Sequence, residues 1–153
     1  MNTDKTHTIL RILDANLNRL QEGVRVVEDI FRYVYDNKEI TYTLKQMRHK
    51  AILQHTDLLL QARDVECDIA KGSIDTEIER LDLAAILHAN FHRICESARV
   101  LEECLKLEEC QKFGKSQTFK SLRYEAYNLH SIANKIITDN IHKYVEDKMQ
   151  YKL

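Results

Sequence analysis

A fourteen-residue pattern occurs twice in this chain, and it constrains the fold more than any other feature of the sequence. The pattern Ala-Asn-x-x-Arg-x-x-Glu-x-x-Arg-Val-x-Glu begins at Ala15 and again at Ala89, a shift of 74 residues. A weaker match follows each copy with a shift of 75, pairing Lys45, Arg48, Ala51 and His55 with Lys120, Arg123, Ala126 and His130. Because the two shifts are nearly equal, we interpret the chain as a duplicated unit.

The hydrophobic pattern within each copy is helical. When each residue is placed at about 100° around a helix, nine apolar residues fall within an arc of about 140°: Ile12, Leu13, Leu17, Leu20, Val24, Val27, Ile30, Phe31 and Val34. The chain has no proline and only three glycines. Since proline cannot lie in a helix interior, its absence favours long helices. No alternating pattern typical of strands competes, so the sequence predicts an all-α chain.

The predicted helices form two hairpins in one domain. We expect helices at residues 8–36, 38–62, 77–107 and 118–149. Caps and turns are expected at Asp36 or Asn37, at Thr76 with Glu79, and at Gly114 with Ser116. Repeat 1 then covers residues 8–62, a loop covers 63–76, and repeat 2 covers 77–149. Two such hairpins, packed by their apolar faces, predict a four-helix bundle with pseudo-twofold symmetry.

Charge and composition exclude several functions. The 23 Lys and Arg residues nearly balance 24 Asp and Glu residues, which gives a net charge of −1 and no signal for a nucleic-acid partner. No apolar run reaches the roughly 18 residues that a membrane span needs, and the polar N-terminus does not resemble a signal peptide. We therefore expect a cytoplasmic protein whose four cysteines are reduced thiols.

Polar residues recur inside the predicted apolar face of both copies. Asn16 and its equivalent Asn90 fall within the arc, where an amide without partners costs on the order of 1–3 kcal/mol. Arg19 and Arg93 lie at its edge. Two compatible interpretations remain open: a polar seam, in which Asn and Arg bind Glu and fix the register, or a ligand cleft lined by these four residues. In both, the matching groups are expected to meet at a shared centre.

A small residue is kept at one position of both copies. Gly23 lies on the same face as Asn16, and Ser97 takes its place in the second copy. Glycine within a helix costs roughly 1 kcal/mol relative to alanine. The position therefore predicts a close approach by another backbone or by a ligand.

Two further segments are candidates for metal binding. The segment 63–68 places Asp64 and Asp68 beside Arg63, and such carboxylates suit Mg²⁺ near phosphates; a solvated acidic loop is the alternative. The series His88, His92 and Glu96 has the spacing i, i+4, i+8 of a metal site on a helix face. Because the first copy has Asp14, Asn18 and Glu22 at the same places, a solvated polar face explains that series more simply.

Six short blocks of the sequence are also familiar as a set. They are Arg11-Ile-Leu-Asp-Ala-Asn-Leu-Asn-Arg19, Glu22-Gly-Val-Arg-Val-Val-Glu-Asp29, Leu44-Lys-x-x-Arg48-His49, Arg63-Asp-x-Glu-x-Asp68, Ala89-Asn90-x-x-Arg93 and Leu122-Arg123-Tyr124. In this order they resemble a helical domain of thiamine biosynthesis, the non-standard hydroxymethylpyrimidine phosphate kinase family. That domain occurs alone and also fused ahead of some bacterial thiamine-phosphate synthases. The resemblance runs from about Ile9 to His130.

The resemblance implies a phosphotransferase. Its substrate would be 4-amino-5-hydroxymethyl-2-methylpyrimidine phosphate, and ATP with Mg²⁺ would convert it to the diphosphate. The chain has no glycine-rich phosphate loop, so arginines and helix N-termini must hold the phosphates. Asp64 and Asp68 are the expected catalytic metal ligands, and Asn16 and Asn90 are expected to bind the aminopyrimidine edge. The expected substrate-binding residues are Asn16, Arg19, Glu22, Arg25, Arg48, Arg63, Asn90, Arg93, Glu96, Arg99 and Arg123.

Other functions stay open at this point. The chain could instead be a non-catalytic pyrimidine-binding or docking partner of a separate thiamine-phosphate synthase, or a purely helical dimerisation domain. The synthase reaction itself belongs to a TIM barrel of about 200 or more residues, so we expect no synthase activity from this all-α chain. The sequence does not decide between a monomer and a homodimer, or whether both halves bind ligand.

Overall fold

The computed structural model describes residues 3–73 and 79–150, and every regular element within these ranges is helical. The elements are α1 (Thr3–Tyr33), α2 (Lys38–Lys50), α3 (Thr56–Ala62), α5 (Leu83–Cys104), the 3₁₀ helix η1 (Glu108–Cys110) and α6 (Ser116–Gln150). The all-α prediction is confirmed. No helix in the described ranges combines the length and apolar content that a membrane span requires.

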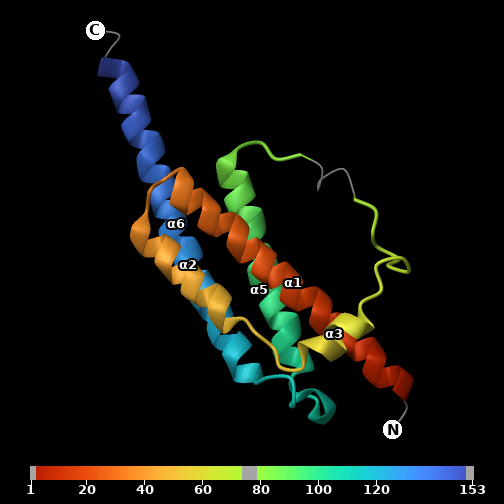
Figure 1. The fold of residues 1–153 in the computed structure, drawn as a ribbon. Coiled ribbons are helices and arrows are strands. Elements are labelled where there is room, and N and C mark those ends of the chain that lie inside the picture. The colour runs from red at the N-terminus through yellow and green to blue at the C-terminus, as the bar shows by residue number, and fades with distance from the viewer. Residues whose placement is uncertain (1–2, 74–78, 151–153) are drawn as a thin grey trace.

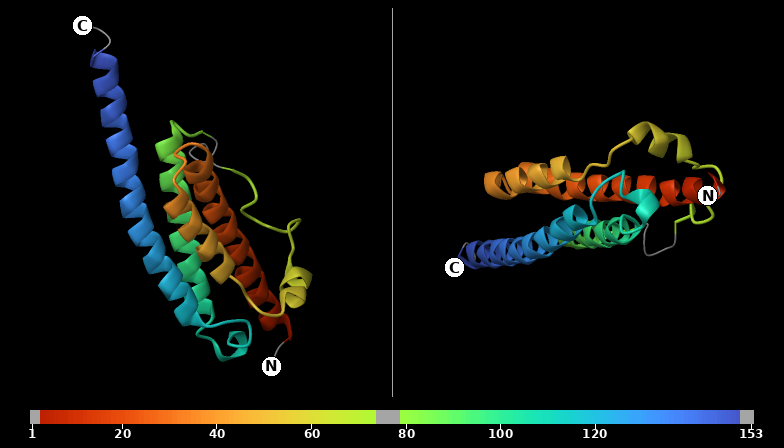
Figure 2. Two further views of the ribbon diagram at one scale, coloured as in Figure 1. Left: turned by 60° about the vertical axis from the view of Figure 1, so that its left-hand side comes forward. Right: turned by 90° about the horizontal axis from the view of Figure 1, so that it is seen from below.

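The helices form two hairpins that pack into a bundle (Figure 1). α2 packs on α1, and α6 packs on α5, while the hairpins join mainly through α1 and α5, which run in opposite directions. From below, α1 with α2 and α5 with α6 form two layers (Figure 2). The C-terminal part of α6 projects beyond the other helices. The expected bundle is therefore present, with α3 as an addition.

The predicted apolar face of α1 supplies a large part of the core. Its fully buried members are Leu13, Leu20, Val24, Val27 and Phe31. Two members of the predicted arc lie outside the core, because Ile12 is 40% exposed and Val34 is 52% exposed. Helical periodicity thus identified the buried face but not its edge.

The close approach predicted at Gly23 is made by the backbone of α5. A Cβ atom at Gly23 would lie 3.0 Å from Cγ1 of Ile94 and 3.3 Å from the carbonyl oxygen of Asn90. Ser97, the equivalent of Gly23, is also buried. Small residues in both copies therefore let α1 and α5 pack closely.

The single helix predicted for residues 38–62 is wrong. α2 ends at Lys50, and His55 adopts a left-handed conformation with φ of 54° before α3 begins. The backbone groups released by this break find partners elsewhere: the amide of Gln54 donates to the carbonyl of Phe113 at 2.7 Å, and Nε2 of Gln21 donates to the carbonyl of Ala51 at 2.7 Å. Contacts with distant parts of the chain stabilise the break.

The second repeat also begins its helix later than predicted. α5 starts at Leu83, where the side chain of Asp82 accepts a hydrogen bond from the amide of Ala85 at 2.7 Å. Asp82 is therefore the cap. Thr76 lies outside the described residues, and Glu79 is not helical.

The other predicted caps agree better with the structure. Asn37 caps α2, since its side chain accepts from the amide of Ile40 at 2.9 Å. Asp36 takes a left-handed φ of 47°, which aspartate tolerates. Ser116 begins α6, close to its predicted start.

The cysteines carry free thiols, as expected from the sequence. Cys95 and Cys110 are buried, and burial raises the pKa of Cys95 to about 11. This thiol therefore stays protonated, and unreactive as a nucleophile, near neutral pH.

Candidate functional site

After α3, the chain folds back over the N-terminal half of α1. Residues 63–68 and α1 enclose a cavity of about 430 Å³, which we call the loop cavity. Three arginines, three aspartates and two asparagines dominate its polar lining: Arg11, Asp14, Asn16, Asn18, Arg19, Arg63, Asp64 and Asp68. The acidic segment and the first half of the repeated pattern, which sequence analysis treated as separate candidates, meet in this one cavity.

Arg63 fastens the loop to α1. Its Nε and Nη2 atoms donate to Oδ2 and Oδ1 of Asp14 at 2.7 and 2.8 Å. These hydrogen bonds, and then the charge of Asp14, raise the pKa of Arg63, with a smaller contribution from Glu22. A bidentate pair of this kind sets orientation as well as energy. Arg63 therefore positions the loop, and the carboxylate of Glu22 lies near enough to contribute to its raised pKa.

The two loop carboxylates also hold the loop in shape. Oδ1 of Asp64 accepts from the amide of Cys67 at 3.0 Å, and Oδ1 of Asp68 accepts from the amide of Ala70 at 3.1 Å. The amide and thiol of Cys67, followed by the charge of Arg11, hold the pKa of Asp64 below its usual value. Nη2 of Arg11 donates to the carbonyl of Asp64 at 3.3 Å. Asp64 is therefore ionised at neutral pH.

Asn16 and Arg19 present unused polar groups to the loop cavity. Nδ2 of Asn16 donates to the carbonyl of Ile12 at 2.9 Å, and no described residue bonds its Oδ1. Arg19 is exposed and forms no ion pair with any described residue. These two residues thus offer a ligand an amide acceptor and an unpaired guanidinium.

The residues present suit Mg²⁺ only if the phosphates of a bound substrate complete its coordination. Among the described residues, no group of three His, Cys, Asp or Glu side chains is placed to hold a metal ion. Mg²⁺ usually keeps several waters and binds through one or two carboxylates plus substrate phosphates. Asp64 and Asp68 each have one oxygen outside the bonds above, so they fit that second arrangement.

The expectation that the repeated amides meet at a shared centre is wrong. Asn90 lies level with Gly23, seven residues from Asn16, which places the two amides about 10 Å apart along α1 at 1.5 Å per residue. Nδ2 of Asn90 donates to the carbonyl of Ile86 at 2.9 Å, and its Oδ1 is buried without a partner in the described part of the chain. The antiparallel packing of α1 and α5 separates the equivalent residues.

The expected symmetric cleft is therefore not formed. Arg93 and Glu96 are exposed on α5 and do not line the loop cavity, and Asn90 does not reach it either.

The remaining predicted arginines bind two buried glutamates. In the first hairpin, Nε of Arg48 lies 3.1 Å from Oε2 of Glu28, and Nη1 of Arg25 lies 3.4 Å from its Oε1. Glu28 is 2% exposed. The Arg48 contact joins α2 to α1, whereas Arg25 and Glu28 lie one turn apart on α1. Both arginines lie outside the loop cavity.

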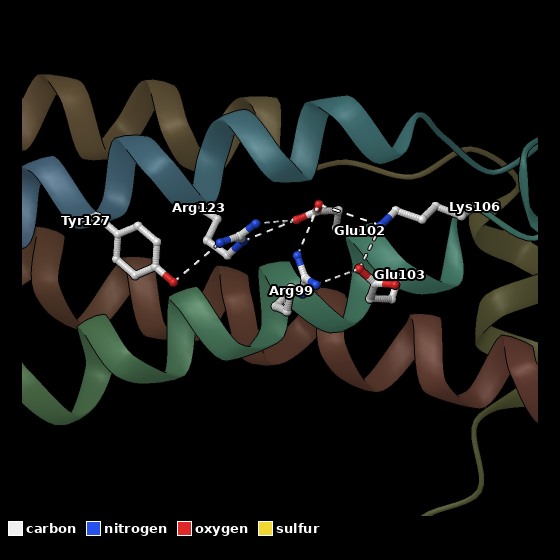
Figure 3. A network of polar contacts seen from close by, with 6 residues as sticks. All are labelled: Arg99, Glu102, Glu103, Lys106, Arg123 and Tyr127. Carbon is white, nitrogen blue, oxygen red and sulfur yellow. Dashed lines mark hydrogen bonds and ion pairs between the residues drawn. The ribbon is translucent and has the colours of Figure 1, made fainter.

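The second hairpin repeats this arrangement. Nη2 of Arg123 lies 2.8 Å from Oε2 of Glu102, and Nη1 of Arg99 lies 3.4 Å from its Oε1 (Figure 3). A polar seam thus exists, but it joins the two helices of each hairpin and not the two hairpins. Its recurrence with the same residue types supports duplication.

Histidines replace the Arg63 anchor in the second hairpin. Nδ1 of His88, the equivalent of Asp14, lies 2.6 Å from Nε2 of His130, and the ring of His130 stacks on Phe91 at 4.6 Å. Burial, followed by the charges of His88 and His92, lowers the pKa of His130. The series His88, His92 and Glu96 belongs to no three-ligand metal group in the described residues.

Sequence reasoning missed Arg11 and Asp14. Both lie on the side of α1 that periodicity assigns to solvent, yet Asp14 is 7% exposed because the segment after α3 covers it. Their position inside the Arg11–Arg19 block is the one signal that could have found them.

Comparison with known proteins gives a family. The profile of the ThiD2 family matches residues 11–132, which include all the charged residues of the loop cavity. The chain belongs to the ThiD2 family.

Three relatives illustrate where this ThiD2 domain occurs. The chain is 41% identical over 124 residues to a thiamine-phosphate synthase of Synechocystis, 36% identical over 134 residues to one of Prochlorococcus marinus, and 38% identical over 124 residues to one of Nostoc. These alignments cover 80%, 87% and 80% of this chain but 35%, 38% and 34% of the relatives. The chain thus spans about a third of their length. No solved structure matches it.

Proposed function

We propose that this ThiD2-family chain acts in thiamine biosynthesis as an ATP-dependent kinase of hydroxymethylpyrimidine phosphate. A phosphate oxygen of the substrate attacks the γ-phosphorus of ATP, and a new P–O bond forms there. The bond from that phosphorus to the β,γ-bridging oxygen breaks, and ADP leaves. The supporting observation is a cavity in which three arginines and two loop carboxylates lie together.

A reaction between two phosphates needs no general base, so the arginines and carboxylates of this cavity are sufficient for it. A phosphate monoester already carries a charge of about −1.5 to −2 at pH 7, so no proton has to be removed from the attacking oxygen. What the reaction requires is cationic groups that bring two anions together in line. Arg11 and Arg19 are assigned to the phosphates, and Arg63 to positioning the loop.

Asp64 and Asp68 are assigned to Mg²⁺, which would supply charge neutralisation between the phosphates of ATP. Asn16 is assigned to the pyrimidine, since its Oδ1 can accept a hydrogen bond from the 4-amino group. A volume of about 430 Å³ lies within the usual range for small-molecule sites.

The test is conversion of ATP to ADP by the purified chain with hydroxymethylpyrimidine phosphate. The double variant Asp64→Asn/Asp68→Asn keeps the side-chain size and removes both charges, and we expect turnover to fall about 100-fold or more. The control is Asp139→Asn, an exposed aspartate on α6 at the position 75 residues after Asp64, which should keep normal turnover. Normal turnover in the double variant would exclude the loop carboxylates from catalysis.

A second candidate is a non-catalytic module that binds the pyrimidine for a synthase. It is favoured by the names of the relatives, of which this chain matches about a third. Under this proposal, hydroxymethylpyrimidine phosphate binds saturably and raises the melting temperature, but no ADP forms. ADP formation would eliminate it.

Synthase activity is expected to be absent from the isolated chain. Residues 3–73 and 79–150 contain no strand, whereas a TIM barrel requires eight. We expect no thiamine phosphate when the chain alone is given the pyrimidine diphosphate and the thiazole phosphate. Product formation in that assay would overturn this expectation.

A further inference from the structure

A second cavity, of about 620 Å³, lies between the C-terminal half of α1 and the start of α2, and we call it the basic cavity. It does not share a residue with the loop cavity. Five cationic side chains and two acids line it, which gives a formal charge of 5 − 2 = +3 in a chain whose net charge is −1. The cations are Arg25, Arg32, Lys38, Lys45 and Arg48, and the acids are Glu28 and Asp36.

Most of this positive charge has no counterion among the residues that the structure describes. Glu28 is shared by Arg25 and by Nε of Arg48, and no described residue bonds the terminal nitrogens of Arg48. Lys38 and Lys45 form no ion pair with any described residue, and Arg32 lies over the ring of the neighbouring Tyr33.

In the second hairpin, cations at equivalent positions have partners within the protein. Glu103 there binds Nη2 of Arg99 at 3.0 Å and Nζ of Lys106 at 2.7 Å, and Tyr127 accepts from Nη1 of Arg123 at 3.5 Å (Figure 3). Lys106 is the equivalent of Arg32, and Glu103 is the equivalent of Asp29. Asp29 forms no ion pair with a described residue, so Arg25 and Arg32 lack the carboxylate that pairs Arg99 and Lys106 in the second hairpin.

We propose that the basic cavity binds a polyphosphate group, of the diphosphate or triphosphate kind carried by nucleotides and diphosphate esters. Arginine forks match phosphate oxygens in pairs, while the two lysines add point charge. The first turn of α2, capped by Asn37, adds the favourable end of a helix dipole. The ring of Tyr42 in the wall provides an apolar surface beside the phosphates.

This site is separate from the one proposed for phosphoryl transfer. The α1 residues that line the two cavities are centred about 20 Å or more apart along the helix, at 1.5 Å per residue. In-line attack needs reacting atoms in near contact. A polyphosphate in the basic cavity therefore acts as a second ligand and not as the phosphoryl donor.

The test is isothermal titration calorimetry of the full chain with inorganic pyrophosphate, at low salt and without Mg²⁺. The variant Arg32→Gln/Lys45→Gln removes two charges from the basic cavity. Its matched control, Lys106→Gln/Lys120→Gln, removes two charges from the equivalent positions of the second hairpin. Arg19→Gln serves as the control for the loop cavity. We expect the dissociation constant to rise at least tenfold in the first variant and to stay within twofold in both controls.

Three results would overturn the proposal. They are no pyrophosphate binding to the unmodified chain, equal weakening in both double variants, and loss of binding in Arg19→Gln alone. The single variants Lys38→Gln and Lys45→Gln provide the same readout if the double variant fails to fold.

Two further titrations characterise the ligand. Tighter binding of ATP than of inorganic tripolyphosphate would assign a contact to the nucleoside, whereas equal binding would limit recognition to the phosphates. Since ADP formation depends on the loop cavity, Arg32→Gln/Lys45→Gln should keep it, so this inference and the proposed function can fail separately.

Discussion

The two hairpins share one sequence pattern, but they differ in their second helix, which is α2 in the first hairpin and α6 in the second. In the first, the chain leaves the helical conformation at Ala51 and returns over α1 as α3 and the loop. In the second, α6 continues without a break from Ser116 to Gln150. The loop cavity exists because of that break, so one copy of the duplicated unit forms a candidate site where the other remains a straight helix.

The arginine of the seam is also more exposed, and has fewer partners, in the first hairpin than in the second. The side chain of Arg123 is 11% exposed and held by both Glu102 and Tyr127, whereas that of Arg48 is 26% exposed and held by Glu28 alone. Identical residue types are therefore structural in one hairpin and face a cavity in the other. Each prediction below changes a residue in one hairpin and its equivalent in the other.

The largest difference should follow from removing the seam carboxylates. Glu102→Gln leaves the buried Arg123 without its charge partner, and we expect a loss of about 3 kcal/mol in the free energy of unfolding. Glu28→Gln should lose only about 1 kcal/mol, because water reaches Arg48 and Arg25. Urea denaturation with both variants at constant m-value measures the difference. Equal losses would show that the two seams are energetically the same.

The next largest difference concerns ligand binding. Arg19 lines the loop cavity, and its equivalent Arg93 does not. Arg19→Gln should lower kcat/KM for hydroxymethylpyrimidine phosphate at least tenfold, which corresponds to about 1.4 kcal/mol, while Arg93→Gln should leave it unchanged. A comparable loss in Arg93→Gln would mean that both halves contribute to the site.

The sequence predicted the class of fold well because its signals are local and repeated. Helical periodicity located the buried face of α1, and the matching shifts identified the hairpins. The prediction of the helices was wrong at residues 51–55, where no proline or glycine marks the break. That break depends on distant partners, namely Phe113 for the amide of Gln54 and Gln21 for the carbonyl of Ala51.

The same limit explains what was found and missed in the site. Arg63, Asp64 and Asp68 could be selected from charge alone. Asp14 could not, because it faces solvent on an isolated helix and is buried only once the loop covers it. The prediction of a symmetric cleft was wrong because equivalent residues on two antiparallel helices lie at different levels.

A smaller difference is expected at the contact between α1 and α5. In Gly23→Ala, the new methyl group would lie 3.0 Å from Cγ1 of Ile94, and we expect overpacking to outweigh the helix propensity of alanine by about 1 kcal/mol. Ser97→Ala adds no atoms and should change stability by less than about 0.5 kcal/mol. Thermal unfolding of both variants compares them. A rise in stability for Gly23→Ala would show that Ile94 moves aside without loss.

The smallest difference should appear in the response to pH. Because the pKa of His130 is lowered in the folded state, the unfolded chain protonates first as the pH falls. Stability contributed by neutral His130 is therefore present above about pH 6.5 and is lost as the pH falls through the folded-state pKa. The 2.6 Å contact between ring nitrogens of His88 and His130 has room for one shared proton but opposes a second charge.

His55, the equivalent of His130, is exposed at the start of α3 and provides the control. The measurement is the free energy of unfolding between about pH 5 and 8. We expect its slope to flatten in His130→Gln and to persist in His55→Gln. The second hairpin has the pair His88 and His130 where the first has Asp14 and Arg63. An unchanged slope in His130→Gln would mean that the histidine pair does not affect stability between these pH values and that another group titrates.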